Sequence, residues 1–269
     1  MNKKGSGFLT ISFKYLRHLL RARHRRGHGI HSTFVYGLVR DAISPASKYV
    51  VPEKLSTYHR KLLGQTDQIR IHDLGAGSSV DQAEVRSIAS IARKSSLTRK
   101  QGKALFSLCK WYGPARVIEF GTGLGISTSY LAAGADRASV VTIEGSPEKY
   151  AFARENTGVY DAGGLEFLLG SFDSYFSEVT EQMPDRTLVF IDGDHRYGPV
   201  MDKLKALLGR EIPGEMMIVL DDIYWSDEME RMWKEIVDDD RVNISLDLFH
   251  FGILIRRPGI AKQHFRVVF

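Results

Sequence analysis

From residue 96 onward, short apolar runs alternate with longer amphipathic stretches in a regular order. The apolar runs predict strands at 116–120, 139–144, 165–169, 187–191 and 215–220. The amphipathic stretches predict helices at 97–112, 126–134, 147–157, 173–182, 198–208 and 226–238. Strands and helices that alternate in this way form a parallel sheet with right-handed crossovers and helices on both faces. The pattern therefore predicts an α/β, doubly wound fold.

The end of the chain departs from this alternation. Residues 242–257 read as two successive strands that meet near Phe249 to Gly252, and a short final strand is expected from Phe265 to Phe269. We therefore expect one α/β domain over residues 96–269, with the earlier residues forming a separate extension.

The segment from Arg116 to Ser127 carries the most specific motif. Its apolar run includes Glu119, and three alternating glycines precede the next helix, namely Gly121, Gly123 and Gly125. Glycines let a ligand approach the backbone closely, and a helix start offers unpaired N–H groups to a negatively charged group. The pattern predicts a nucleotide-like cofactor above the end of a parallel strand.

The next strand refines this prediction, because it ends in Glu144. A carboxylate at that position can accept hydrogen bonds from the two hydroxyls of a ribose. The dinucleotide fingerprint would have glycine where this chain has Ile126. The spacing therefore favours an adenosine cofactor that lacks a pyrophosphate.

Acidic residues also follow the fourth and fifth strands. Asp192 follows one strand, and Asp221 and Asp222 follow the other. Ligands bind beyond the carboxyl ends of such strands, and carboxylates gathered there need a cation, a ligand or hydrogen bonds. Three oxygen ligands suit Mg²⁺ or another hard divalent ion. The alternative is that these acids only cap helices.

A histidine, His195, lies three residues beyond Asp192. An imidazole has an ordinary pKa near 6.5 and can accept a proton at neutral pH. The alternative is a turn histidine that hydrogen-bonds a neighbouring loop.

These motifs resemble the class I S-adenosylmethionine-dependent methyltransferases over roughly residues 96–257. The segments Asp192 to His195 and Leu220 to Trp225 are similar to those of the metal-dependent O-methyltransferases of the catechol and caffeoyl-coenzyme A type. The resemblance implies a mostly parallel, seven-stranded Rossmann-like sheet with a C-terminal antiparallel hairpin. It also implies S-adenosylmethionine as cofactor and a hydroxyl group of a small molecule as methyl acceptor.

The resemblance assigns roles to individual residues. It implies His195 and Asp192 as catalytic residues, with histidine where the related enzymes have lysine. It implies a divalent ion held by Asp192, Asp221 and Asp222, the last standing where the family has asparagine. It places Ser171 and Phe172 at the adenine. The implied cofactor-binding residues are Glu119, Gly121, Thr122, Gly123, Gly125, Ser127, Glu144, Gly145, Ser171, Phe172 and Asp192.

Three other functions remain open at the level of sequence. A nicotinamide-dependent oxidoreductase would share the sheet and Glu144, although Ile126 and the acidic pair disfavour it. An RNA ribose methyltransferase would explain the basic N-terminal arm. A non-catalytic binding protein could retain the fold without the reaction.

The N-terminal region differs from the rest in charge. Residues 1–40 contain nine Lys and Arg and no acid, whereas the remainder has 28 basic and 32 acidic residues. Residues 7–40 read as amphipathic helices, with a second helix capped by Ser32. One apolar face is expected to hold Phe8, Ile11, Tyr15, Leu19 and Leu20.

We expect residues 1–95 to form a basic helical extension and a lid or substrate region. This arm packs on its own body, or on a second subunit in a homodimer, or binds an anionic membrane surface or nucleic acid. Within the region, Asp73 to Gly77 imitates a cofactor loop, but no apolar helix follows at once, so we read it as an ordinary loop.

Cysteine and histidine usage adds two expectations. The single cysteine, Cys109, excludes an internal disulfide and is read as a buried structural thiol. His24, His28 and His31 have spacings that could suit a metal, but the intervening glycines interrupt the helix, so we expect no metal there.

The sequence has no apolar run of about 20 residues, the length needed to span a bilayer, and no signal-peptide pattern. We therefore expect a cytoplasmic protein.

Overall fold

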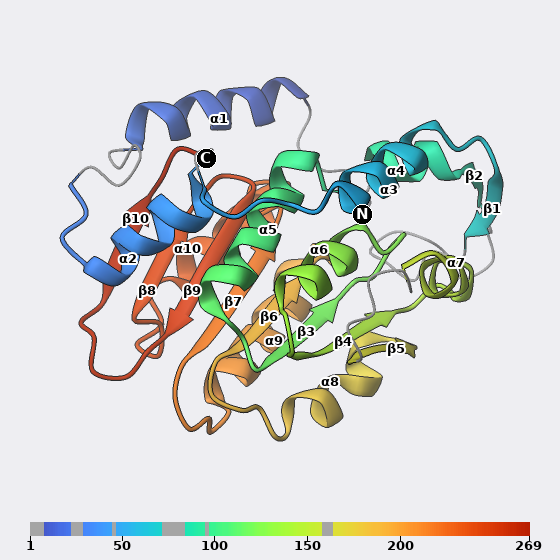
Figure 1. The fold of residues 1–269 in the computed structure, drawn as a ribbon. Helices are drawn as coiled ribbons and strands as arrows, with labels where there is room; N and C mark the ends of the chain where they lie inside the picture. Colours follow the sequence, from blue (N-terminus) through green and yellow to red (C-terminus); the bar gives the residue numbers. More distant parts are fainter. Residues whose placement is uncertain (1–7, 23–28, 45–46, 72–83, 95–96, 158–163) are drawn as a thin grey trace.

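A computed structural model describes residues 8–22, 29–44, 47–71, 84–94, 97–157 and 164–269 (Figure 1). In these residues an eight-stranded sheet has the order β10-β8-β9-β7-β6-β3-β4-β5. Its strands are β3 (Arg116–Phe120), β4 (Ser139–Glu144), β5 (Leu165–Leu169), β6 (Thr187–Ile191), β7 (Met216–Asp221), β8 (Ile244–Asp247), β9 (Phe251–Arg256) and β10 (Gln263–Arg266). The helices that follow β3 to β7 are α6 (Ile126–Gly134), α7 (Pro147–Thr157), α8 (Phe172–Thr180), α9 (Tyr197–Gly209) and α10 (Asp227–Ile236).

The pairing of the strands confirms the predicted doubly wound fold. Strands β5, β4, β3, β6 and β7 run parallel, so their carboxyl ends meet at one edge of the sheet. Strand β9 is antiparallel to both β7 and β8, which gives the expected C-terminal hairpin. The sheet has eight strands and not seven, because the predicted final strand, β10, pairs in parallel with β8 and covers its open edge.

Alternating side chains of the sheet pack into two cores. Val117 and Leu188 belong to the core that includes α5 (Arg99–Tyr112), whereas Ile118 and Val189 belong to the core with α9 and α10. A strand buried on both faces has this two-sided apolar character because successive side chains point in opposite directions. Cys109 lies within the first core, and burial raises the pKa of its thiol. It is the structural thiol that the sequence predicts.

The N-terminal region joins the same core as α5. Its elements are α1 (Phe8–Arg21), α2 (Thr33–Leu38), a π-helical turn (Val39–Ile43), α3 (Glu53–Gly64), β1 (Gln68–Ile71), β2 (Glu84–Ser87) and α4 (Ile88–Lys94). Ser32 caps α2 by accepting a hydrogen bond from the backbone of Val35, as predicted. The loop Asp73 to Gly77 and the histidines His24 and His28 lie outside the described residues.

Helix α1 packs through part of the predicted face, because Tyr15 contacts Phe249 and Ile11 and Leu19 are half-buried. Lys14 and His18 face the body of the protein, while Leu20 is 79% exposed. The physical reason is that the body also offers α1 acidic partners, Asp227, Glu230 and Asp247, which draw Lys14 and His18 inward. In Figure 1 this helix, in dark blue, lies across the end of the sheet that carries β8 and β10. Among the described helices, none combines the length and apolarity that a membrane crossing requires.

Candidate active site

The glycine-rich turn lies at the carboxyl end of β3, between the ends of β4 and β6. The backbone N–H of Gly121 donates to Ile143 at 3.0 Å, and that of Asp192 donates to Phe120 at 2.9 Å. Gly125, with φ of +77°, is the N-cap of α6, and a side chain there would collide with Thr157. The turn is thus held from both neighbouring strands, and the start of α6 opens toward the same edge.

Glu119 is fully buried beneath this turn. Its Oε2 accepts hydrogen bonds from the hydroxyls of Thr128, at 2.5 Å, and Thr142, at 2.6 Å. Burial raises the pKa of Glu119 to about 7, against the lowering effect of the hydroxyls of Ser127, Thr128 and Thr142. Its Oε1 accepts no hydrogen bond of ordinary geometry from the described residues. A buried carboxyl oxygen in that state is suited to a cationic donor.

Glu144 ties the turn to β4. One carboxylate oxygen accepts from the backbone N–H of Gly123 at 2.8 Å, and the other accepts from Ser146 at 2.9 Å. A carboxylate oxygen has two lone pairs and can accept more than one hydrogen bond. Thr122 lies beside them and shares a 2.6 Å hydrogen bond with Thr142. Gly145 follows Glu144 directly at the strand end.

The remaining predicted cofactor residues lie around the same edge. Ser127 is buried in the first turn of α6. Ser171 caps α8 by accepting from the backbone of Ser174 at 3.2 Å, which leaves its side chain exposed. The ring of Phe172 packs edge-on to that of Phe120 at 5.5 Å and covers Gly193. Phe172, which follows β5, therefore packs against the residues that follow β6.

The structure brings the predicted acids together. The carboxyl groups of Asp192 and Asp221 are close enough to share a hydrogen bond, and Asp222 lies near both. Burial, followed by the charge of Asp222, raises the pKa of Asp192 to about 8. Burial, followed by the charge of Asp192, raises the pKa of Asp221 well above its ordinary value. At neutral pH the three carboxyl groups therefore do not all carry a negative charge, because at least one of them keeps its proton.

The three acids Asp192, Asp221 and Asp222 do not form a complete metal-binding site in the described structure. Within the part of the chain that the structure describes, no three His, Cys, Asp or Glu side chains converge in the way that a metal ion requires. The Oδ1 of Asp221 is buried and accepts no hydrogen bond from the described residues. The assignment of Asp192, Asp221 and Asp222 as metal ligands stays a prediction.

The backbone is strained at this corner. Asp194, Asp222 and Phe249 have φ values of +50°, +52° and +71°, in the left-handed region that L residues rarely occupy. Such residues persist only where the surroundings hold them, and they cluster at functional sites. The backbone N–H of Asp222 donates to His250 at 2.8 Å, which fixes this turn to the loop between β8 and β9.

His195 lies next to the acids. Burial lowers its pKa from 6.5, and the charges of Asp222 and Asp194 oppose that effect without cancelling it. The imidazole is therefore mostly neutral at pH 7 and able to accept a proton. Its ring centre lies 6.4 Å from that of Trp225, which is 43% exposed.

Sequence reasoning missed two sets of residues around this edge. The first is an aromatic group behind Asp222, in which Tyr224 stacks on Phe249 at 5.0 Å and Tyr15 of α1 meets Phe249 at 4.9 Å. The second is Tyr58 of α3, whose hydroxyl donates to the backbone oxygen of Leu124 at 2.8 Å. The aromatic residues Tyr224 and Phe249 both lie next to predicted strand ends, so the sequence could have indicated that they meet. Nothing in the sequence links Tyr58 to residue 124.

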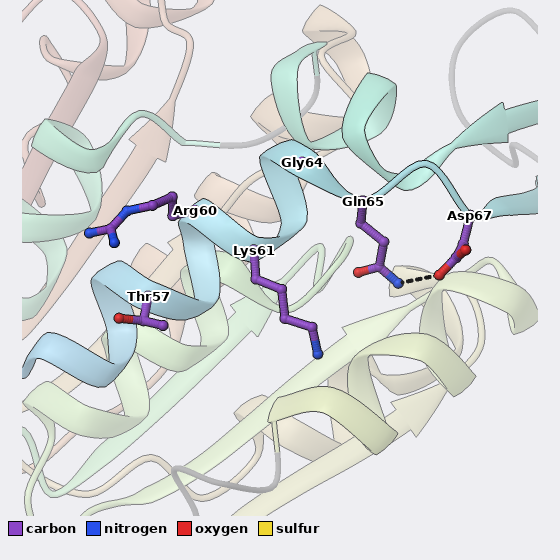
Figure 2. Close-up of a pocket in the computed structure, with 6 residues that line it drawn as sticks. All are labelled: Thr57, Arg60, Lys61, Gly64, Gln65 and Asp67. Carbon is purple, nitrogen blue, oxygen red and sulfur yellow. Dashed lines mark hydrogen bonds between the residues drawn. The ribbon is translucent and has the colours of Figure 1, made fainter.

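A shallow hollow of about 640 Å³ lies along α3 (Figure 2). Its lining residues are Thr57, Arg60, Lys61, Gly64, Gln65 and Asp67. Figure 2 shows that the side chains of Gln65 and Asp67 are paired there, at 2.9 Å. None of these residues belongs to the acid group or the glycine turn, so we place the active site at the strand ends.

Comparison with known proteins agrees with this geometry. Residues 118–223 match the family described as "Methyltransferase domain", a range that runs from β3 to the turn after β7. No curated protein is a significant match to the sequence.

Several solved structures share the fold. A methyltransferase from Podospora anserina, bound to SAH, has a TM-score of 0.58 at 15% identity and covers 96% of this chain and 99% of its own. An O-methyltransferase from Bacillus cereus, in complex with SAH, has a TM-score of 0.50 at 22% identity and covers 61% and 83%. The O-methyltransferase TomG from Streptomyces achromogenes, in complex with SAM, has a TM-score of 0.51 at 18% identity and covers 61% and 82%.

Proposed function

We propose that this chain, a class I S-adenosylmethionine-dependent methyltransferase, transfers the methyl group to an oxygen atom of a small molecule. The observation that carries the proposal is the position of His195 near Asp222, which itself lies near Asp192 and Asp221, at the same sheet edge as the glycine turn. This arrangement joins a cofactor site to a group that can accept a proton.

The residues at the turn fit the cofactor. A side chain at Gly123 would meet no atom within 4 Å, so the backbone of the turn faces open space there. The unpartnered oxygen of Glu119 suits an ammonium group, and the carboxylate of Glu144 suits the ribose hydroxyls. Ser171 and Phe172 are the proposed adenine contacts, with Gly121, Thr122, Gly125, Ser127 and Gly145 completing the cofactor residues.

S-adenosylmethionine, when bound, supplies an electrophilic methyl group on a sulfonium sulfur. The work of the protein is then to align the acceptor oxygen with the carbon–sulfur bond and to remove its proton. Neutral His195 takes that proton at an imidazole nitrogen. Asp222 and Asp194 stabilise the imidazolium that forms, because their charges favour the protonated ring.

A divalent cation is a further part of the proposal. Asp192, Asp221 and Asp222 would hold it, and the proton that they share would leave when it binds. The ion would lower the pKa of an acceptor hydroxyl. The three carboxyl groups would have to converge on the ion, since among the described residues they do not yet form a metal-binding set.

The alternatives receive less support. The match to a methyltransferase family argues against a nicotinamide-dependent oxidoreductase and against a protein that retains only the fold. Ribose methylation of RNA would rest on the basic arm, and one cation of that arm, Lys14, pairs with Asp227 and Glu230 of the body.

Two measurements test the proposal. Calorimetry with S-adenosylhomocysteine should show tight binding that Glu144→Ala weakens at least about tenfold, by analogy with the loss of charge-assisted hydrogen bonds. Glu178→Ala, at an exposed position of α8, is the matched control. Unchanged binding by Glu144→Ala would contradict the ribose assignment.

The second measurement follows transfer of a labelled methyl group to a panel of phenols, catechols, carboxylic acids and RNA. We expect label on a small-molecule oxygen, and we expect His195→Gln to lower kcat while leaving cofactor binding intact. Label on RNA alone would contradict the acceptor class.

A further inference from the structure

Helix α1 presents two different faces. Its inner face holds it to the body: Lys14 Nζ lies 2.8 Å from Asp227 and 3.0 Å from Glu230, and His18 Nε2 lies 3.2 Å from the backbone oxygen of Val267. These contacts fix the rotation of the helix about its axis. The opposite face must therefore point away from the protein, as the outer position of α1 in Figure 1 shows.

That outer face is apolar. Phe13 is 69% exposed, Leu16 is 55% exposed and Leu20 is 79% exposed. Positions three and seven residues apart lie along one side of a helix, so the three side chains form one continuous stripe. Exposed Arg17 and Arg21 follow its border. An apolar stripe bordered by arginines indicates a binding surface and not an accident of composition.

The positive charge of the N-terminal arm indicates which kind of partner binds the apolar stripe. Residues 1–40 carry nine Lys and Arg with no Asp or Glu. A second copy bound through the same face would bring two cationic arms together, which costs free energy by repulsion. A nucleic acid would satisfy the arginines but would leave the apolar stripe in water. An anionic bilayer surface satisfies both, because its phosphates pair with the arginines while the apolar side chains enter the acyl boundary.

We propose that α1 docks the protein onto an anionic phospholipid surface through Phe13, Leu16 and Leu20. The helix lies in the plane of the interface and does not cross it. This proposal is independent of the reaction, since it depends only on the outer face of α1.

Vesicle flotation tests the proposal with the full chain. The protein should float with vesicles of phosphatidylcholine that contain about one-third phosphatidylglycerol, and should not float with phosphatidylcholine alone. The triple variant Phe13→Ser, Leu16→Ser, Leu20→Ser should lose about tenfold or more in vesicle affinity. Arg17→Gln with Arg21→Gln should lower the affinity and its dependence on salt. Val50→Ser is the control, because Val50 is 86% exposed outside α1.

The variants change exposed side chains, so thermal melting and binding of S-adenosylhomocysteine should match the parent protein. Failure of that cofactor binding in the parent would count against the proposed function and not against the docking surface. Flotation that the triple variant retains would overturn the docking proposal. So would a wild-type dimer that the triple variant converts to a monomer without any vesicle binding, or an arm that binds RNA but no vesicle.

Discussion

A methyl group added to the α carbon of Gly121 would lie 1.9 Å from the backbone oxygen of Asp192. Gly121 also has a φ of +111°, which an L side chain rarely adopts. The turn after β3 and the turn after β6 are thus in direct backbone contact. This contact places the cofactor turn against the first residue of the acidic group.

We predict that Gly121→Ala destabilises the protein by at least about 3 kcal/mol, because backbone strain and a clash with backbone act together. Gly123→Ala is the matched control. Its φ of +56° is also left-handed, but nothing lies within 4 Å of the added atom. It should cost only about 1 kcal/mol. Urea unfolding measures both, and equal losses would contradict the steric argument.

Glu119 should lower the stability of the cofactor-free protein as pH rises from about 4.5 to about 7. Burial raises the pKa of Glu119 from 4.5 to about 7, so the folded state holds a proton that the unfolded state releases in this range. The loss from this residue is on the order of 3 kcal/mol. Asp247 does not contribute there, since its pKa is lowered to about 2 and its stabilisation is lost only in stronger acid.

Glu119→Gln should flatten this pH dependence, since the amide keeps an acceptor for Thr128 and Thr142 but carries no titrating proton. Asp192 and Asp221 also have raised pKa values, so the free energy of unfolding should keep a weaker dependence on pH in the variant. Urea unfolding of both proteins at several pH values tests the prediction. Parallel curves would show that Glu119 is not the group that titrates.

The strands, and the edge of the sheet at which the site lies, could be predicted from the sequence because each depends on a short, continuous pattern of residues. The run Arg116–Phe120 and the run Ser139–Glu144 are mostly apolar and β-branched, and their bounds match the structure. The position of Asp192 beside Asp221 follows from the rule that parallel strands end at one edge.

The N-terminal contacts could not be read in the same way. His18 meets Asp247 across 229 residues of chain, and neither residue has a local pattern that names the other. The packed face of α1 mixes polar Lys14 and His18 with Tyr15, so apolar periodicity alone does not define it. Strands β1 and β2 are short and rich in polar residues, so they lack the alternation that reveals longer strands. Helix α3 does carry a helical spacing, Leu55, Tyr58 and Leu62, which the sequence prediction did not use.

Magnesium should stabilise the protein if the acidic group closes on an ion. We expect added Mg²⁺ to raise the Tm of the wild-type protein, because a ligand that binds only the folded state stabilises it. Asp221→Asn should remove this response and, without Mg²⁺, should raise stability by about 1 kcal/mol, because a buried acidic neighbour of Asp192 is gone. Asp240→Asn, at an exposed position, is the control. A Tm that ignores Mg²⁺ would refute the metal assignment and leave the fold untouched.

His18 should contribute more to stability than Lys14, although both residues hold α1. His18 is 3% exposed, and its Nδ1 lies 3.3 Å from the fully buried carboxylate of Asp247. His18→Ala removes one of the groups that hold that charge and also its ring contact with Phe249, which should cost about 1–3 kcal/mol. Lys14 pairs with Asp227, whose side chain is 89% exposed, and with Glu230, which keeps Lys234 as a partner. Lys14→Ala leaves no buried acid without a cation, so it should cost less than about 1 kcal/mol. Urea unfolding measures both losses, and trypsin cleavage at Arg17 and Arg21 reports whether α1 has detached. A larger loss from Lys14→Ala would mean that the ion pairs of the lysine, and not the buried histidine, anchor the helix.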